Sequence, residues 1–405
     1  MYSLIIYLYM FAANLASLFS QKVRLLMCGH RETWRILRRE IGDGGYVWFH
    51  AASLGEFEQG RPLMERLRRR HPEKKILLTF FSPSGYEVRK NYEGADVVCY
   101  LPFDTPLNAR KFVRLAHPEA AFFIKYEFWR NYIDVLHREG IPIYSVSSIF
   151  RDKQIFFRSY GRNYARCLKR ITHFYVQNER SRELLAKLGV EAVSVVGDTR
   201  FDRVADIRRQ ARPLPLAGSF AEGRQVLVAG SSWTPDEDIL IPYFNGRLEM
   251  KLVLAPHVVS ESHLQEIEAK LRRPAVRYSV ATPETVAAAD CLIIDCYGLL
   301  SSLYRYATVA YVGGGFGVGI HNVPEAAVYG CPVIIGPNNR KFREARALIA
   351  NGGCVEIGGA GDFSAVMDNF LANGQRLREA GRAAGSYIAD NAGAADKIFN
   401  DIYGS

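Results

Sequence analysis

Short apolar runs rich in β-branched and aromatic residues alternate with helix-like stretches along most of this chain. The candidate strands are residues 46–51, 76–81, 97–101, 121–124, 142–146, 173–177 and 193–196 in the first half, and 225–229, 251–255, 291–294, 308–312 and 332–335 in the second. Nearly continuous apolar runs are typical of strands that are covered on both faces, as in parallel sheets. The pattern therefore predicts an α/β chain, and 405 residues are enough for two such domains.

The two halves begin in the same way, with a strand, a turn of small residues and a helix start. Residues 46–51 lead into Ala52–Glu56, and residues 225–229 lead into Gly230–Trp233. Two doubly wound domains that face a cleft are therefore expected, with ligands beyond the carboxyl ends of the strands.

Residues 213–224, rich in Pro, Gly and Ala, are predicted to be the linker between the two domains. The expected domains are then residues 22–212 and 225–405. The last segment, 374–403, is expected to be helical and could cross back to pack on the first domain.

Charge is distributed unevenly along the sequence. Residues 1–210 contain 35 Lys+Arg and 22 Asp+Glu, a balance of +13, whereas residues 211–405 contain 17 and 20, a balance of −3, which together give the net charge of +10. A basic first half predicts an anionic partner there, although chance scatter is the alternative. The seven cysteines show no CxxC spacing, so a disulfide framework or a zinc site is not expected.

Residues 1–21 contain no charged side chain. As one helix they would extend about 31 Å at roughly 1.5 Å per residue, close to the ~30 Å hydrocarbon thickness of a bilayer. Basic residues follow, beginning with Lys22 and Arg24. The segment is predicted to be a membrane anchor or an interfacial helix, with the rest of the chain on the cytoplasmic face. A helix folded onto the rest of the protein is the alternative.

Several reactive residues follow predicted strands. Glu56, Glu127, Arg200 and the pair Pro256-His257 all stand at or shortly after the end of such a run. Carboxylates at strand ends are candidate general bases, although any one of them alone is more often a capping acid or an ion-pair partner.

A glycine-rich stretch, residues 313–327, follows the strand at 308–312. Clustered glycines let a phosphate approach backbone N–H groups, and a helix that begins near Pro324 would add its positive end. Glu325 could accept hydrogen bonds from ribose hydroxyls. The stretch is neither a GxGxxG fingerprint nor a P-loop, and it indicates nucleotide-sugar binding. A tight turn that packs a helix on the sheet is the structural alternative.

Basic and aromatic residues are mixed in residues 151–170. This composition suits phosphorylated lipid headgroups and equally suits nucleic acid, but no signature of a nucleic-acid-binding module accompanies it. No metal-ligand spacing and no convincing Ser-His-Asp arrangement occurs in the sequence.

Taken together, these motifs resemble the bacterial 3-deoxy-D-manno-octulosonic acid (Kdo) transferase family. The matching segments are Ala-Ala-Ser-Leu-Gly-Glu at 51–56, Tyr-Leu-Pro-Phe-Asp at 100–104, Tyr-Glu-Phe-Trp at 126–129, Gln-Asn-Glu at 177–179, Gly-Asp-Thr-Arg-Phe-Asp at 197–202, Ala-Pro-His at 255–257, Val-Gly-Gly-Gly-Phe at 312–316, Gly-Ile-His-Asn-Val-Pro-Glu-Ala-Ala at 319–327 and Ile-Gly-Pro at 335–337. They occur in order across nearly the whole chain.

The resemblance implies a GT-B type fold of two Rossmann-like domains, with the acceptor domain first and the donor domain second. It implies inverting transfer of Kdo from CMP-Kdo to the tetraacyl disaccharide bisphosphate precursor of lipid A (lipid IVA), in lipopolysaccharide biosynthesis at the cytoplasmic face of the inner membrane. Neither a metal nor a cofactor is expected, and nucleic acid is not an expected partner.

The resemblance also assigns roles to individual residues. Glu56 would be the general base, and Glu127 and Arg200 would stabilise the transition state. The residues expected to hold CMP are Pro256, His257, Gly298, Leu299, Leu300, Asn322, Val323, Pro324 and Glu325.

Two alternatives remain open at this stage. One is a GT-B glycosyltransferase that uses a different nucleotide sugar. The other is a membrane-associated nucleic-acid-binding protein.

Overall fold

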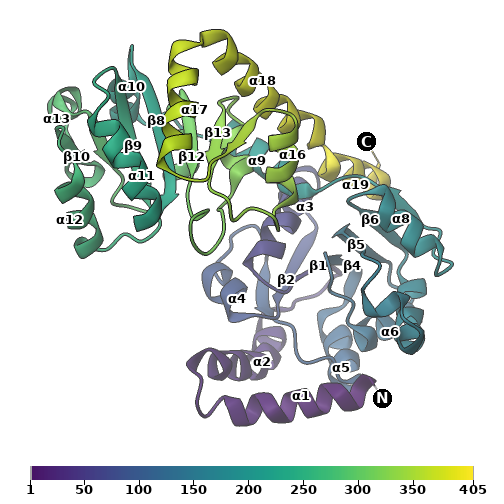
Figure 1. Ribbon diagram of the computed structural model, residues 1–405. Coiled ribbons are helices and arrows are strands. Elements are labelled where there is room, and N and C mark those ends of the chain that lie inside the picture. Colours follow the sequence, from purple (N-terminus) through teal and green to yellow (C-terminus); the bar gives the residue numbers. More distant parts are fainter. Residues whose placement is uncertain (1, 405) are drawn as a thin grey trace. The chain divides into compact units, whose positions relative to one another are not determined.

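The computed structural model describes residues 2–404 and divides the chain into two compact units (Figure 1). Unit 1 extends to Arg203 and resumes at Ala392, and unit 2 is Val204–Asn391. The chain passes from the first unit to the second within helix α9 (Thr199–Gln210).

Each unit is built on a seven-stranded sheet in which every paired strand is parallel. The order in unit 1 is β3-β2-β1-β4-β5-β6-β7, and in unit 2 it is β10-β11-β9-β8-β12-β13-β14. In unit 1 the strands are β1 (Tyr46–Ala51), β2 (Lys75–Phe80), β3 (Val97–Tyr100), β4 (Pro118–Ile124), β5 (Ile143–Ser148), β6 (His173–Val176) and β7 (Val193–Val195). In unit 2 they are β8 (Gln225–Ser232), β9 (Met250–Pro256), β10 (Ala275–Arg277), β11 (Cys291–Ile293), β12 (Val309–Val312), β13 (Val333–Ile335) and β14 (Cys354–Glu356).

These two parallel sheets confirm the predicted fold class. The strand order reverses between β1 and β4 in unit 1 and between β8 and β12 in unit 2, which are the positions where doubly wound sheets bind ligands. Two strands, β10 and β14, were not among the candidates, and both lie at the edges of the second sheet.

Helices cover the sheets. Those of unit 1 are α1 (Tyr2–Ala16), α2 (Gln21–Glu40), α3 (Leu54–Arg70), α4 (Pro83–Arg89), α5 (Pro106–Ala116), α6 (Arg130–Arg138), α7 (Arg162–Ala165), α8 (Glu179–Ala186) and α19 (Ala394–Tyr403). Those of unit 2 are α10 (Pro215–Ala221), α11 (Thr234–Asn245), α12 (Glu261–Lys270), α13 (Pro283–Ala288), α14 (Leu300–Leu303), α15 (Val323–Ala327), α16 (Arg343–Ala350), α17 (Ala360–Ala372) and α18 (Gly374–Asn391). Helix α10 occupies most of the segment predicted to be the linker.

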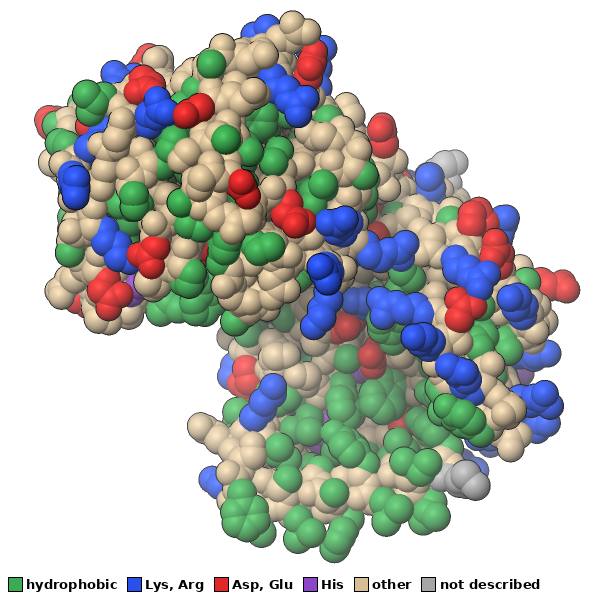
Figure 2. Space-filling model, viewed as in Figure 1, with side chains coloured by type: hydrophobic (Ala, Val, Ile, Leu, Met, Phe, Trp, Pro, Cys, Tyr) green, Lys and Arg blue, Asp and Glu red, His purple; other side chains and the backbone are tan. Residues whose placement is uncertain are grey.

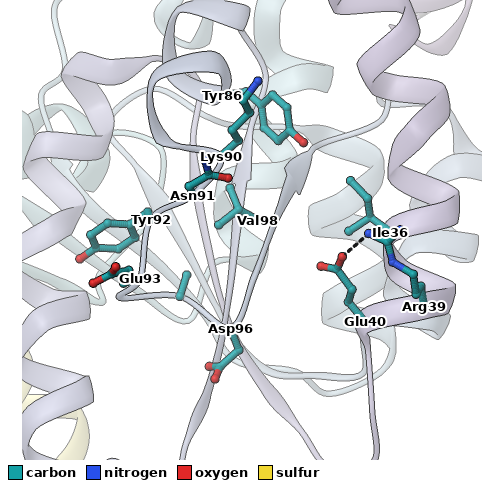
Figure 3. A pocket seen from close by; sticks show the side chains of 11 residues that line it. Ile36, Arg39, Glu40, Tyr86, Lys90, Asn91, Tyr92, Glu93, Asp96 and Val98 are labelled. Carbon is teal, nitrogen blue, oxygen red and sulfur yellow. Dashed lines mark hydrogen bonds and ion pairs between the residues drawn. The ribbon is translucent and has the colours of Figure 1, made fainter.

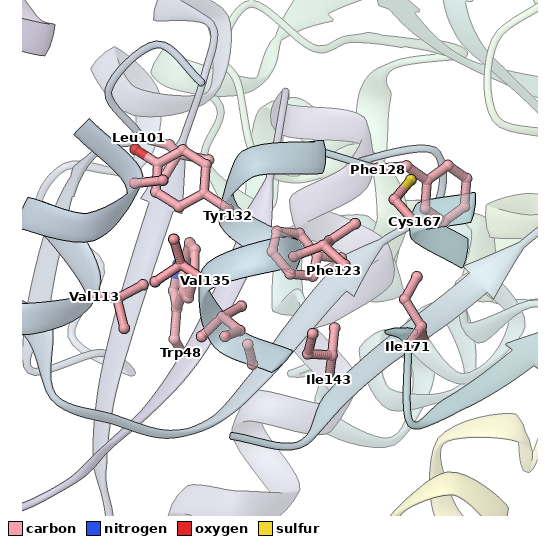
Figure 4. Packing of buried hydrophobic residues seen from close by; sticks show 14 of the residues in the cluster. Trp48, Leu101, Val113, Phe123, Phe128, Tyr132, Val135, Ile143, Cys167 and Ile171 are labelled. Atoms are coloured by element: carbon pink, nitrogen blue, oxygen red, sulfur yellow. The ribbon is translucent and has the colours of Figure 1, made fainter. Parts of the chain in front are cut away.

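The two faces of the first sheet have separate cores because side chains alternate along a strand. Tyr46 and Trp48 of β1 point into one core with helices α2, α5 and α6, where Trp48 packs beside Phe123 and Tyr132 (Figure 4). Val47 and Phe49 point into the other core, which is covered by α3 and α19.

Helix α19 belongs to unit 1 although it ends the chain. Its apolar side chains Ile398 and Phe399 are buried in the same core as α3. The buried Arg66 of α3 pairs with Asp396, at 2.5 Å, and with Asp202.

The predicted uncharged segment 1–21 is not one continuous helix. Helix α1 ends at Ala16, and the Ser20 hydroxyl oxygen accepts a hydrogen bond from the Val23 amide to cap a second helix, α2. A serine at this position favours the start of a new helix, because its side chain satisfies an amide of the first turn.

Within residues 2–404, no helix combines the length and the apolar character needed to cross a bilayer.

Candidate active site

Glu56 lies in the first turn of α3, directly after β1 and next to the point where the strand order reverses. The Ser53 hydroxyl, at the N-cap position, donates a hydrogen bond to Glu56 Oε2. The side chain is half-buried. A carboxylate at this position is stabilised by the positive end of the helix and can accept a proton from a bound hydroxyl group.

Glu127 lies on the loop after β4, the neighbour of β1 in the sheet. Its Oε2 atom is 2.7 Å from the Trp129 indole nitrogen and 3.3 Å from Nε2 of His50, which is on β1. The loop begins at Lys125, whose φ of 68° is rare for a residue with a side chain. Such strain clusters at functional sites, where the surrounding structure holds it in place.

Arg200 lies in the first turn of α9, just after β7. Its Nε donates to Asp198 Oδ2 at 2.9 Å, and Asp198 is buried. The other oxygen of Asp198 accepts from the side-chain amide of Gln59 at 2.9 Å. Gln59 is three residues beyond Glu56 on α3. The same helix therefore carries Glu56 and, through Gln59, holds the Asp198 carboxylate that orients Arg200.

The three predicted catalytic residues therefore lie at the carboxyl edge of one sheet. They follow β1, β4 and β7, and they are connected through α3 and through His50. Glu56 and Glu127 stand next to the strand reversal, which is the position expected for a ligand site, and Arg200, which follows the edge strand β7, is linked to α3 through Asp198 and Gln59.

Sequence reasoning did not single out His50, Gln59, Trp129 or Asp198 individually. A signal for His50 was present, because it is a polar residue in the apolar run of β1 and pairs in register with Thr79 of β2. Two polar residues side by side in buried strands indicate a hydrogen-bonded network.

In unit 2, three aromatic side chains meet beyond β8, β9 and β12. The ring of His257 stacks on Trp233 at 4.6 Å and on His321 at 4.5 Å between centroids. The Trp233 indole N–H donates to His321 Nε2 at 3.2 Å. Burial, together with the neighbouring His257, lowers the pKa of His321, which favours its neutral form. The outer ring, His257, is exposed.

The glycine-rich loop is shaped by close packing. A Cβ on Gly315 would lie 2.5 Å from the Cα of Gly336, and Gly314 has a φ of +89°. The amide of Gly314 donates to the buried carboxylate of Asp236 at 2.9 Å. These glycines are therefore needed for the turn itself, in agreement with the structural alternative for this part of the loop.

The remaining predicted donor-binding residues surround the same edge of unit 2. Asn322 donates to Glu325 at 2.6 Å at the start of α15, where Pro324 lies in the first turn. Leu300 packs closely against Gly230, near the end of β8. A Cβ atom added to Gly230 would lie 2.6 Å from Cδ1 of Leu300. Val323 is buried and Gly298, Leu299 and Pro256 lie at or after the ends of β11 and β9. The structure thus places these residues at one sheet edge, on the end of β9, on loops and in the first turns of α14 and α15.

Concave surfaces are found elsewhere in unit 1. A pocket of about 370 Å³ lies between the end of α2, α4 and edge strand β3 (Figure 3). It is lined by Ile36, Arg39, Glu40, Tyr86, Lys90, Asn91, Tyr92, Glu93, Ala95, Asp96 and Val98. None of the predicted site residues lines it. Within residues 2–404, no group of three or more His, Cys, Asp or Glu side chains is arranged to hold a metal ion.

Comparison with known proteins identifies relatives of the chain. A family model described as 3-deoxy-D-manno-octulosonic-acid transferase (kdotransferase) matches residues 24–203, which lie in unit 1. The chain is 29% identical over 377 residues to the 3-deoxy-D-manno-octulosonic acid transferase of Bordetella pertussis, covering 88% of this chain and 86% of the relative. It is 27% identical over 328 residues to the enzyme of the same name from Chlamydophila psittaci, covering 77% and 75%.

A solved structure shares the fold. UDP-GlcNAc 2-epimerase from Neisseria meningitidis, bound to UDP-GlcNAc, superposes with a TM-score of 0.61 at 13% identity, covering 89% of this chain and 100% of that one. At this identity the likeness concerns the fold alone.

Proposed function

The chain is similar over most of its length to Kdo transferases and is a glycosyltransferase, and from this premise we propose that it transfers Kdo from CMP-Kdo to the tetraacyl disaccharide bisphosphate precursor of lipid A, with inversion. The observation that carries the proposal is the location of Glu56, Glu127 and Arg200 at one sheet edge of the unit that the family model matches.

Glu56 is the proposed general base. A sugar hydroxyl is a weak nucleophile at neutral pH, so a carboxylate within hydrogen-bond reach must take its proton as the new bond forms. The acceptor oxygen attacks the anomeric carbon of Kdo, its proton passes to Glu56, and the bond from that carbon to the phosphate of CMP breaks. Ser53, which donates to Glu56 Oε2, leaves the second oxygen of the carboxylate for this role.

Arg200 and Glu127 are the proposed stabilising charges. Negative charge develops on the CMP phosphate as it leaves, and positive charge develops on the oxocarbenium-like sugar. A guanidinium offsets the first and a carboxylate offsets the second, provided that both are fixed in advance. Asp198 holds Arg200, and Trp129 and His50 hold Glu127, so both charges are preorganised.

Unit 2 is proposed to hold CMP-Kdo with the loops that follow β8, β9, β11 and β12. The exposed face of His257 offers a stacking surface for a pyrimidine, and Glu325 offers a carboxylate to ribose hydroxyls. Because CMP carries one phosphate, the proposed reaction has no diphosphate for a metal to clamp.

Helix α1 is proposed to lie on the inner membrane at its cytoplasmic face. Figure 2 shows hydrophobic side chains gathered along α1 and the turn that follows it. The most exposed are Leu4, Ile5, Leu8, Phe11, Leu15, Leu18 and Phe19, the last with 90% of its surface exposed. Lys22, Arg24 and Arg31 follow in sequence, and basic side chains beside an apolar surface favour anionic lipids.

Donor selectivity tests this proposal. We expect the full-length protein to bind CMP-Kdo in a calorimetric titration, and CMP to compete with it. UDP-GlcNAc, the ligand of the structural neighbour, is expected not to compete. Competition by UDP-sugars without binding of CMP-Kdo would replace the proposal with a glycosyltransferase that uses a different nucleotide sugar.

A further inference from the structure

His50 is fully buried in β1, with 0% of its surface exposed, yet both of its ring nitrogens have polar partners. Nδ1 is 2.9 Å from the hydroxyl oxygen of Thr79, and Nε2 is 3.3 Å from Glu127 Oε2. His50 thus connects the interior of the sheet with a carboxylate at its edge.

The hydrogen bonds around Thr79 determine which nitrogen of His50 carries the proton. The Trp48 indole N–H donates to the Thr79 hydroxyl oxygen at 2.8 Å. The Thr79 proton can then go to His50 Nδ1 at 2.9 Å or to the Phe49 carbonyl oxygen at 3.4 Å. The shorter bond is the stronger one, so Nδ1 is an acceptor and the proton of the neutral ring is on Nε2.

The Nε2 proton of His50 is therefore directed to Glu127. Trp129 Nε1 lies 2.7 Å from the same oxygen, Oε2, and 3.0 Å from His50 Nε2. Trp129 could donate to His50 Nε2 only if that nitrogen carried no proton; with the proton on Nε2, as the bonds around Thr79 indicate, both N–H groups donate to Glu127 Oε2. Oε1 of Glu127 accepts no hydrogen bond from any residue in 2–404 and is left for a ligand.

We infer that His50 is a positioning residue for Glu127. The relay from Trp48 through Thr79 fixes the tautomer of His50, and His50 together with Trp129 fixes the orientation of the carboxylate. This inference rests on the proposed function, in which Glu127 stabilises the positive charge that develops on the sugar. A group held in place before the reaction acts without reorganisation, so loosening it slows the chemical step and leaves donor binding unchanged.

The test compares two replacements of His50 in Kdo transfer from CMP-Kdo. His50→Leu fills the space and removes both polar atoms. His50→Gln retains an N–H donor that can reach Glu127. We expect His50→Leu to lower kcat by about ten- to one-hundred-fold with the KM for CMP-Kdo unchanged, and His50→Gln to restore most of the loss.

A double-mutant cycle separates positioning from a general structural effect. In a Glu127→Gln background, His50→Leu should lower kcat by no more than about twofold, because both changes act through the same carboxylate. Trp129→Phe, which removes the other donor to Oε2, should show the same non-additivity and serves as the second variant if His50→Leu does not fold.

His173→Leu is the matched control, since His173 is a histidine of the same sheet that bonds to a hydroxyl group, Ser194, away from Glu127. It should leave kcat unchanged.

Three results would overturn the inference. They are an unchanged kcat in His50→Leu, an equal fold loss in the wild-type and Glu127→Gln backgrounds, and a kcat in His50→Gln as low as in His50→Leu. Absence of Kdo transfer by the wild-type protein is a different failure, because it removes the proposed function itself.

Discussion

At the scale of single residues, we expect the replacement of Glu56 to have the largest effect on Kdo transfer. Glu56→Gln removes the proposed proton acceptor but retains the shape of the side chain. We expect transfer of Kdo to fall by about 10²- to 10⁴-fold while CMP-Kdo binding is unchanged. Steady-state turnover and calorimetric titration measure the two effects. Glu65→Gln, farther along α3 and paired with Arg61, is the matched control and should transfer Kdo normally. Near-wild-type turnover in Glu56→Gln would contradict the role of the base.

Arg200 is expected to act on the rate more than on affinity. Arg200→Ala should lower kcat by roughly 10²-fold or more, since it removes the charge proposed to stabilise the leaving phosphate, and should change the Kd for CMP-Kdo less. Arg200→Lys should recover part of the rate because it retains the charge but loses the planar fork that bonds to Asp198. Weaker donor binding with an unchanged kcat would argue against this role.

The pH dependence of stability is another residue-scale expectation. Asp104 is fully buried, and burial raises its pKa from 3.8 to about 6, although Tyr2 and two backbone amides donate to it. A carboxyl group whose pKa is higher in the folded state than in the unfolded state destabilises the fold when it is ionised. The contribution of Asp104 to the free energy of unfolding therefore becomes more favourable as the pH falls from 7 through 6 toward 4. The shift corresponds to roughly 3 kcal/mol.

Urea unfolding at pH 7 and pH 4.5 measures this effect. When the pH is lowered from 7 to 4.5, the free energy of unfolding of the wild-type protein should rise relative to that of Asp104→Asn, whose side chain at position 104 does not titrate. A constant difference between the two proteins would show that Asp104 titrates normally.

Sequence reasoning reached part of this residue-scale picture. Glu56, Glu127 and Arg200 could be singled out because strand ends in parallel sheets converge at one edge. His50 and Asp198 could not, since their importance depends on contacts with Glu127 and Arg200 that form only when distant segments meet.

At the scale of elements, the positions of strands could be predicted from the sequence where the apolar runs were continuous. The twelve candidate strands all occur. Strands β10 (Ala-Val-Arg) and β14 (Cys-Val-Glu) did not stand out because each is a short edge strand that ends in a charged residue, unlike the equally short edge strand β7 (Val-Ser-Val). Edge positions need fewer apolar side chains, so their sequences contain less of the pattern on which a prediction depends. The uncharged N-terminal segment was wrongly expected to be a single helix, because the capping role of Ser20 outweighed its apolar surroundings.

Helix α1 provides the element-scale prediction. Phe11→Asp places a charge on its exposed face, and we expect binding to anionic phospholipid vesicles to weaken by about tenfold or more. Flotation with vesicles measures this, and the melting temperature should be unchanged because Phe11 is exposed. Val88→Asp, at an exposed apolar position on α4, is the control and should bind normally. Equal binding of Phe11→Asp and wild type would place the membrane contact elsewhere.

At the scale of the whole molecule, the uneven charge has a functional interpretation. The basic first half contains the proposed acceptor residues and the apolar helix, which suits a bisphosphorylated lipid at an anionic surface. The nearly neutral second half contains the proposed donor site, where a small nucleotide can be held by loops and a few side chains. The charge pattern was visible in the sequence. The place of α19 in unit 1 was not, because an apolar helical face does not specify which sheet it covers.

The central claim is tested most directly by the product of the complete protein. The wild-type chain is incubated with CMP-Kdo and the tetraacyl disaccharide bisphosphate precursor in detergent, and the lipid is analysed by mass spectrometry. We predict a lipid product that is heavier by one or more whole Kdo units, formed together with CMP and absent when Glu56→Gln replaces the wild type. An unmodified lipid, or a product formed from a UDP-sugar in place of CMP-Kdo, would contradict the account.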